Sequence, residues 1–344
     1  MRTTIAIGLA LTSAACAATT PRPVPPPTVV VISFEQKMSW ILRLEDQRVL
    51  RDPPPGLSGG GGVVIASAAP DLVQLLSDRE ARIRRRAALA IGHVGLRAGV
   101  APLIALLSDP DPEVRQMAAF ALGLIGDASA RDALVTALGD MSPLVQGSAA
   151  EALGLIGDKT AADAVGRLAA QVVESGALAT PPGDDVDARR DVPAAAFRLA
   201  MTALVRLEAY DQLAAAVLDP FGQPRVRWWP VAFALQRLAN PRALPALVTL
   251  AKDTNPYTST FAIKGLGAVK DSSAVPALLP LLINGDRNVV IETLRALGRI
   301  GAPSAASALM RVMQTRGVDP TVRVEAMAAL GALHAPGTLD LVLD

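Results

Sequence analysis

The stretch AAFALGLIGD at residues 118–127 decides the fold, because it returns 31 residues later as AAEALGLIGD at residues 149–158. Aligning the related segments on the glycine of "ALG", or on its equivalent, gives one phase position per copy. These phase positions are Gly92, Gly123, Gly154, Val205, Gln236, Gly267, Gly298 and Gly331. They lie 31, 31, 51, 31, 31, 31 and 33 residues apart, so one unit holds an insertion of 20 residues. A fixed period of this length is the signature of a repeat architecture.

Each unit contains two helical halves separated by a turn. The first half is short and apolar, as in APLIALL at residues 101–107, and the turn SDPDPE then places Asp111 to cap the second helix. In the second half, one apolar stripe recurs at helical spacing: Val114, Ala118, Ala121, Leu122 and Ile125. Neither helix can bury its stripe alone, so stability must come from stacking. The sequence therefore predicts an all-α fold, an α-solenoid of about eight two-helix repeats over residues 70–338, with the insertion at 172–192.

The composition excludes several classes of protein. Hydrophobic residues make up 51% of the chain and aromatic residues 3%, so the chain is not disordered and favours helices over a β-sandwich. The 33 Lys and Arg residues balance 32 Asp and Glu residues, which argues against nucleic acid as a partner. Cys16, His93 and His334 cannot form a zinc cluster, and the aspartates of residues 184–191 fit a solvated loop better than a Ca²⁺ site. No metal or cofactor is predicted.

The repeats resemble HEAT-like repeats of the phycobilisome-lyase type, in the phase motif and in the segment D-P-x-V-R at residues 111–115. The resemblance implies an α–α superhelix whose second helices line the concave side. It also implies a ladder of buried arginines eight residues before the phase positions. The ladder arginine is present at Arg84, Arg115 and Arg323 and is replaced at Gln146, Phe197, Trp228, Ser259 and Val290. A buried arginine needs partners, and the candidates are Asp78 for Arg84 and Asp111 for Arg115.

The N-terminal residues favour export. Residues 1–15 have the pattern of a signal peptide, and Cys16 directly after them resembles the lipidated cysteine of bacterial lipoproteins. Residues 16–33 form a Pro-rich tether, residues 34–50 an amphipathic helix, and residues 51–69 a Pro- and Gly-rich linker. The helix is expected to dock on the first repeat, with binding to a partner as the alternative. The chain is therefore predicted to be exported, as a periplasmic protein or as a lipoprotein anchored to a membrane through Cys16.

Two further segments bear on what the repeats do. Residues 339–344, LDLVLD, copy the first helix of another unit, which predicts a truncated further repeat. The opening helix, the Pro-rich break and RWWPVAFALQRL at residues 227–238 resemble exported bacterial proteins in which HEAT repeats precede a cyclophilin-type prolyl isomerase domain. That resemblance implies a client-binding region of a periplasmic peptidyl-prolyl isomerase whose catalytic domain is missing from this chain.

The sequence gives no sign of an enzyme. It lacks the nucleophile elbow G-x-S-x-G and the phosphate loop G-x-x-x-x-G-K-[ST], and neither histidine has the neighbouring Glu of the iron-binding HEAT-fold hydroxylases. The predicted function is a protein-interaction scaffold. The alternatives are the isomerase client region and, third, a phycobilin lyase-like or other HEAT-repeat enzyme.

The repeat phase locates a candidate protein-binding surface. Positions three before and one after each phase position lie off the buried stripe. With the adjacent Trp229, these positions in the C-terminal half give Arg206, Trp229, Phe233, Arg237, Lys264, Arg295 and Arg299. A basic surface with aromatic side chains suits an acidic or extended peptide. The aromatic residues between 197 and 261 fit either a repacked core or a binding surface, and the sequence leaves both open.

Overall fold

The structure is a computed structural model that describes residues 32–52, 70–180, 182 and 191–333. Within these residues an extra helix, α1 (Phe34–Asp46), precedes eight helix pairs. The second helices of the pairs are α3 (Ala81–Val94), α5 (Pro112–Ile125), α7 (Pro143–Ile156), α9 (Pro193–Arg206), α11 (Trp229–Leu238), α13 (Pro256–Val269), α15 (Arg287–Ile300) and α17 (Pro320–Ala332). The first helices are α2 (Leu72–Leu75), α4 (Val100–Leu106), α6 (Arg131–Ala137), α8 (Ala162–Glu174), α10 (Tyr210–Val217), α12 (Leu244–Leu250), α14 (Val275–Leu278) and α16 (Ala306–Gln314). The predicted all-α solenoid of two-helix repeats is confirmed.

The second helix of a unit begins and ends where its sequence dictates. Pro112 occupies the first turn of α5, and the Asp111 carboxylate accepts hydrogen bonds from the amides of Glu113 and Val114 at 2.8 and 3.4 Å. The helix ends at Gly126, whose φ of 73° lies in the left-handed region that glycine adopts at little cost. The predicted cap at Asp111 is therefore confirmed.

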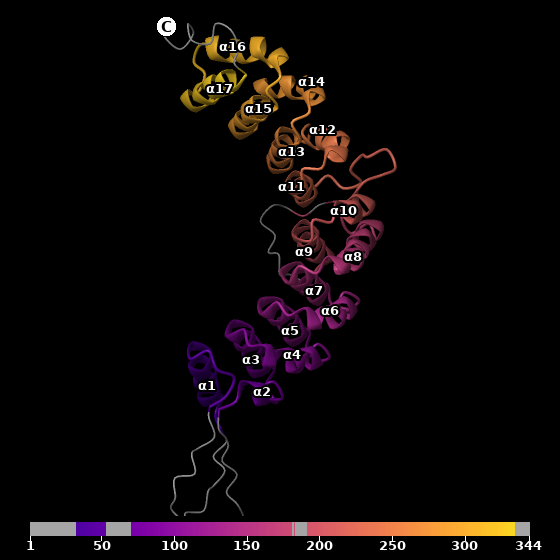
Figure 1. Cartoon of the computed structure of the whole chain (residues 1–344), viewed down its shortest axis with the longest axis vertical. Coiled ribbons are helices and arrows are strands. Elements are labelled where there is room, and N and C mark those ends of the chain that lie inside the picture. The colour runs from indigo at the N-terminus through magenta and orange to yellow at the C-terminus, as the bar shows by residue number, and fades with distance from the viewer. Residues whose placement is uncertain (1–31, 53–69, 181, 183–190, 334–344) are drawn as a thin grey trace, which may run out of the picture. The chain divides into compact units, whose positions relative to one another are not determined.

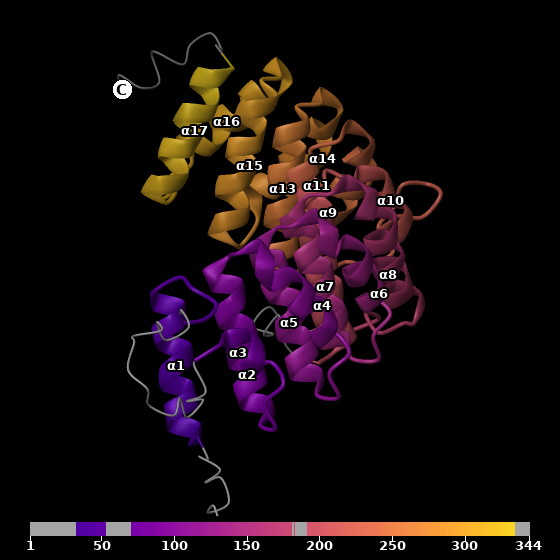
Figure 2. The same ribbon diagram turned by 60° about the horizontal axis from the view of Figure 1, so that its bottom comes forward.

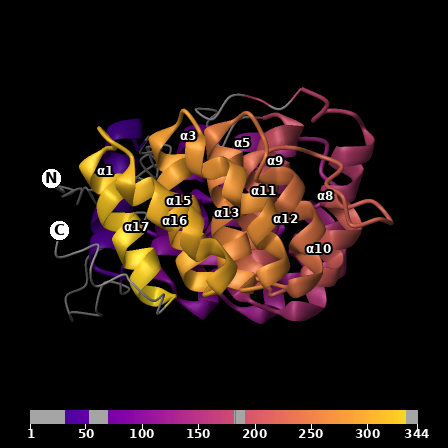
Figure 3. The same ribbon diagram turned by 90° about the horizontal axis from the view of Figure 1, so that it is seen from above.

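The second helices form one row and the first helices form another, as Figure 1 shows for the labelled helices. Each second helix packs against the next one along the chain, from α3 and α5 to α15 and α17. Figure 2 shows α3, α5 and α7 side by side, and Figure 3 follows the same row at its other end, through α17, α15 and α13. The core lies between the two rows, where the apolar stripes of both kinds of helix are buried.

Glycine at the phase position sets the distance between neighbouring second helices in most units, although units four and five have Val205 and Gln236 there. A Cβ atom added at Gly123 would lie 2.7 Å from the Cα atom of Ala152, and one added at Gly92 would lie 2.8 Å from the Cα atom of Ala121. Any side chain at these positions would meet backbone of the next helix. The glycine therefore allows the close approach of adjacent units that the repeat pattern predicts.

Helix α1 packs beside α3, as predicted for docking on the first repeat (Figure 2). Ile41 and Leu44 are fully buried, whereas Phe34 and Leu42 are exposed, so the helix buries the face that carries Ile41 and Leu44. The helix also ends at Asp46 rather than at residue 50. Leu50 is nevertheless buried, and its carbonyl oxygen accepts a hydrogen bond from the Leu72 amide at 2.8 Å.

Polar contacts fix α1 in this position. Lys37 forms an ion pair with Asp78, and Glu45 pairs with both Arg86 and His93 of α3. The imidazole of His93 is exposed at the helix surface, as expected, with Nδ1 2.6 Å from Glu45 Oε1. These contacts favour docking over the alternative in which the helix is free for a partner.

The arginine ladder uses partners other than those expected. Arg84 donates two hydrogen bonds to the Asp109 carboxylate, at 2.7 and 2.8 Å, and Arg115 donates two to Asp140, both at 2.8 Å. The partner in each case lies 25 residues further along the chain, in the following turn. Asp78 receives only a backbone contact from Arg84, at its carbonyl oxygen, and Asp111 is occupied as a helix cap. The ladder therefore links neighbouring units, which a pairing within one turn would not do.

The ladder changes character along the chain. Gln146 keeps only the hydrogen bond to a backbone carbonyl, that of Asp140, at 2.7 Å. Phe197 and Trp228, at the next two ladder positions, are buried and stack on each other with ring centroids 6.0 Å apart and planes inclined by 19°. Ser259 is buried and Val290 is apolar. Ionic links between the first units thus give way to aromatic and small side chains in the middle.

The insertion predicted at 172–192 overlaps the end of helix α8. Residues 172–174 belong to α8, which runs to Glu174 and is 13 residues long, where α4 and α6 have 7 residues each. The turn that follows buries Leu178, and α9 begins at Pro193. The remaining predictions for the signal peptide (1–15), Cys16, most of the tether (16–33), most of the linker (51–69) and residues 339–344 fall outside the described residues.

Candidate interaction surface

One side of the second-helix row is accessible, and we call it the second-helix face. It consists of the positions three before and one after each phase position. These are Leu89, His93, Phe120, Leu124, Glu151, Leu155, Thr202, Arg206, Phe233, Arg237, Lys264, Ala268, Arg295, Arg299, Ala328 and Ala332, all of them exposed or half-buried. The repeat phase therefore predicted correctly which positions lie off the buried stripe.

The aromatic residues between 197 and 261 divide into core and surface. Phe197, Trp228 and Tyr210 are buried, so the repacked core accounts for them. Trp229, Phe233 and Phe261 are half-buried and contact one another, with Phe233 on the second-helix face, and we call these three the aromatic ridge. Its ring centroids are separated by 6.4, 6.1 and 5.5 Å. The core interpretation is thus confirmed for the buried aromatic residues, and the binding interpretation stays a prediction for the aromatic ridge.

Cations surround the aromatic ridge. The Arg198 guanidinium lies 5.9 Å from the Trp229 ring centroid, and Lys264 Nζ lies 6.0 Å from that of Phe261. Arg206 and Arg237 are exposed and form no ion pair or hydrogen bond within the described residues. The ridge with these neighbours is an apolar, cationic surface, whose positive charge is available to an acidic partner.

Arg295 and Arg299 are exposed on the same face but are already paired. Arg295 binds Glu292 of its own helix at 2.7 Å and Glu325 of α17 at 2.5 Å. Arg299 lies 3.7 Å from Glu292. The hydrogen bonds that Arg295 donates to Glu325 and Glu292 raise the pKa of Arg295, and the one that Glu325 accepts lowers the pKa of Glu325. The two arginines therefore contribute less free charge than their sequence positions imply.

The sequence reasoning missed Glu292. Its side chain is almost completely buried, and its Oε2 atom has no hydrogen-bond partner within the described residues. Glu292 lies six residues before the phase position Gly298, where most other units have a small or apolar residue. This position is not part of the apolar stripe, and Arg86 and Glu325 are also charged there, so the sequence carries no signal for the burial of Glu292.

A cleft of about 630 Å³ opens between the first halves of α13 and α15. Tyr257, Phe261 and Lys264 line one wall, and Ile291, Glu292 and Arg295 line the other. Tyr257 is 60% exposed at its edge. Because Phe261 belongs to both, the cleft continues the aromatic ridge, so a ligand on the ridge has an adjoining recess for a side chain.

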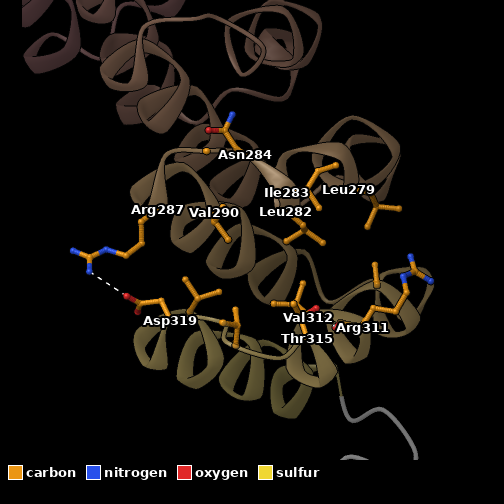
Figure 4. A pocket seen from close by; sticks show the side chains of 14 residues that line it. Leu279, Leu282, Ile283, Asn284, Arg287, Val290, Arg311, Val312, Thr315 and Asp319 are labelled. Atoms are coloured by element: carbon orange, nitrogen blue, oxygen red, sulfur yellow. Dashed lines mark hydrogen bonds and ion pairs between the residues drawn. The ribbon is translucent and has the colours of Figure 1, made fainter.

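A second cavity, of about 720 Å³, lies among the 3-10 segment Leu279–Ile283, α15, α16 and α17 and is drawn in Figure 4. Leu282 and Val290 face Val312 across it, and the Arg287–Asp319 ion pair lies at one end. Val290 stands where Arg84 and Arg115 stand in the first units. The cavity lies outside the second-helix face. Aliphatic side chains line it where a ladder arginine would stand, so we attribute the cavity to the replacement of that arginine by Val290.

The described residues offer neither a metal-binding cluster nor a membrane-spanning helix. They contain no group of three or more His, Cys, Asp or Glu side chains placed to hold a metal ion. Among their helices, none is both long enough and apolar enough to span a membrane.

Comparisons with known proteins agree with the repeat architecture. The family model described as HEAT repeats matches residues 100–178 and 222–293, and the model described as PBS lyase HEAT-like repeat matches residues 83–109 and 289–315. The phycocyanobilin lyase subunit alpha of Nostoc sp. strain PCC 7120 is 30% identical over 137 residues, which cover 35% of this chain. The match spans 48% of that relative, about half of its length.

Solved structures resemble the chain at lower identity. The YibA protein of Escherichia coli is 23% identical with a TM-score of 0.49, covering 76% of this chain and 91% of that one. The complex of CpcE and CpcF of phycocyanin lyase from Nostoc sp. PCC7120 is 19% identical with a TM-score of 0.39, covering 82% and 98%. These likenesses are too distant to bear on what this chain binds. The repeat models and the eight stacked helix pairs agree, and the chain contains HEAT repeats, among them repeats of the PBS lyase HEAT-like kind.

Proposed function

We propose that this chain is a non-catalytic scaffold that binds a protein or an extended peptide through the second-helix face of units four to seven. The observation that carries the proposal is the aromatic ridge of Trp229, Phe233 and Phe261, half-exposed beside the free cations Arg206 and Arg237. HEAT repeats present such surfaces to protein partners, since each unit adds one helix to a continuous face.

The chemistry of the surface favours an acidic partner. Trp and Arg dominate the energetics of protein interfaces because they combine a large apolar area with directional polar groups. Arg206 and Arg237 can bind a carboxylate of the partner without first breaking an ion pair within the described residues. Arg295 and Arg299 would first have to release Glu292. We therefore assign the recognition of carboxylates to Arg206, Arg237 and Lys264, and a positioning role to Arg295 and Arg299.

The proposal includes no cofactor and no nucleic acid. Aromatic, aliphatic and cationic side chains make up most of the face, together with His93, Glu151 and Thr202. The likeness to a phycocyanobilin lyase subunit keeps a lyase-like enzyme as the less favoured alternative. A pigment that copurifies with the chain would favour it. The isomerase-client alternative uses the same face, and it predicts capture of many unfolded exported proteins instead of one partner.

Replacing Arg206 and Arg237 together by glutamate is expected to abolish partner capture without lowering the melting temperature, because both side chains are exposed and unpaired within the described residues. The measurement is crosslinking from a benzoylphenylalanine placed at Phe233, in intact cells, followed by mass spectrometry.

The matched control reverses two cations outside the second helices, Arg225 and Lys252, which are also exposed. This control variant should capture the same protein as the parent chain. Equal crosslinking by all three proteins would remove the basic surface from the proposal, and equal loss in both variants would reduce it to a general effect of charge.

Export and lipidation complete the proposal. Replacing Cys16 by serine is expected to move the protein from the membrane fraction to the soluble periplasmic fraction, because Cys16 is the chain's one cysteine and a lipid anchor requires its thiol. Immunoblots of fractionated cells measure the distribution. A variant that stays with the membranes would contradict the anchor.

A further inference from the structure

Five arginines lie at the start of the second helix of the first repeat, within residues 79–86: Arg79, Arg82, Arg84, Arg85 and Arg86. The ladder uses Arg84, whereas Arg85 pairs with Glu113 of α5 and Arg86 with Glu45 of α1. Arg82 is exposed and has no ion pair or hydrogen bond within the described residues. The function proposed for units four to seven does not involve any of these side chains.

Taken by themselves, these arginines destabilise helix α3, which carries four of them. Arg82 lies three and four residues before Arg85 and Arg86, a spacing at which like charges repel. The first turn of α3 holds no acidic residue, and its cap residue Glu80 forms no side-chain cap bond. Cations near the start of a helix are also unfavourable. Acidic residues of neighbouring segments compensate Arg84, Arg85 and Arg86. Arg82 is left without such compensation, which is expected of a residue kept for binding.

The arginines surround a pocket of about 500 Å³ among α1, α3 and α5. Its apolar lining comes from Met38, Leu89 and Met117, all half-buried, with Phe34 40% exposed at the edge. Arg82, Arg85 and Arg86 contribute the cationic lining. The Nη1 atom of Arg86 is buried without a hydrogen-bond partner in the described residues. The pocket thus joins an apolar floor to guanidinium groups that are incompletely paired.

We propose that this pocket binds a segment of a partner protein in which one aliphatic side chain is flanked by carboxylates. The aliphatic side chain contacts Met38, Leu89 and Met117, where the unbranched methionines adapt their shape to the ligand. The carboxylates pair with Arg82 and Arg85, since the planar guanidinium group matches a carboxylate with two hydrogen bonds. The existing Arg85–Glu113 pair is exposed on both sides and therefore weak, so a ligand displaces it at little cost.

The pocket is formed in part by α1, which makes it specific to the N-terminal end of the stack. Met38 and Phe34 come from α1, and the ion pairs of Lys37 and Glu45 hold that helix in place. The residues involved are separate from the aromatic ridge. This inference therefore does not rest on the function proposed for units four to seven.

The test uses the full chain and a fluorescein-labelled peptide with one leucine between two pairs of glutamates. Fluorescence anisotropy at low ionic strength should show saturable binding, weakened at least about tenfold when glutamines replace the glutamates or alanine replaces the leucine. Arg82→Glu should weaken binding by about the same factor while the melting temperature stays the same or rises. Arg82→Gln, which removes the charge without reversing it, should show a smaller loss.

The matched control is Arg79→Glu, which changes the net charge equally at an exposed arginine that does not line the pocket. Binding by this variant should stay within about threefold of the parent chain. Absence of saturable binding by the parent chain, equal losses in the Arg79 and Arg82 variants, or no loss in the Arg82 variants would each overturn the proposal. Phe233→Ala should leave this binding unchanged, which separates it from the aromatic ridge.

Discussion

Replacing Leu122 by alanine is expected to lower the free energy of unfolding by about 2–5 kcal/mol. Leu122 is fully buried in α5, which packs against α3 on one side and α7 on the other. The substitution removes apolar area from the core and leaves a cavity that helices on both sides would have to move to fill. Urea denaturation followed by circular dichroism measures the loss.

Leu124 provides the matched control, because it lies two residues further along the same helix and is 38% exposed. The Leu124→Ala variant is expected to lose under about 1 kcal/mol. Equal losses in the two variants would contradict the inward stripe on which the repeat assignment depends.

Replacing Asp140 by alanine is expected to cost about 2–3 kcal/mol, because it leaves the guanidinium of Arg115 without its carboxylate. The two side chains are 17% and 13% exposed, so the loss should fall below that of a fully buried pair. Arg115 would retain its hydrogen bond to the Asp109 carbonyl, the contact that Gln146 makes alone in the next unit. As the control, Asp132→Ala removes an exposed pair with Arg131 and should change stability by under about 0.5 kcal/mol.

The effect of Asp140 should depend on pH. Burial raises the pKa of its carboxyl, but hydrogen bonds from Arg115 and from the Ser142 amide outweigh burial, so the pKa lies below its ordinary value. A carboxyl whose pKa is lowered by folding stabilises the protein above its unfolded pKa, about 3.9, and loses that contribution as the pH falls toward the folded value. The difference in stability between parent chain and Asp140→Ala should be full above about pH 5 and shrink below about pH 4. A difference that is constant across this range would contradict the ionic ladder.

The repeat period predicted the fold because each unit meets the same physical requirements. A glycine must stand where Gly123 meets Ala152, and Asp111 must cap a helix that begins with proline. Such local requirements are visible in one unit and confirmed by its copies. The extension of α8 to Glu174 escaped prediction because the insertion has no copy elsewhere to compare with it.

Contacts between units were harder to predict than contacts within one. The aspartates nearest to Arg84 and Arg115 in sequence are not their carboxylate partners, since the ladder reaches into the following turn. For the same reason, Arg295 was assigned to a free basic surface although Glu325 of the next helix binds it. Exposure follows from helical phase, but the pairing of exposed charges depends on which side chains of adjacent helices face one another.

Helix α1 has a consequence for assembly. A stack of similar layers can in principle accept a further layer from another molecule, and contacts between unlike ends lead to open-ended growth. At the N-terminal end α1 covers the side of α3 that a foreign layer would use, and its Lys37 occupies the Asp78 carboxylate. While α1 stays docked, that side of α3 is therefore closed to a second molecule, and head-to-tail growth from this end of the stack is blocked.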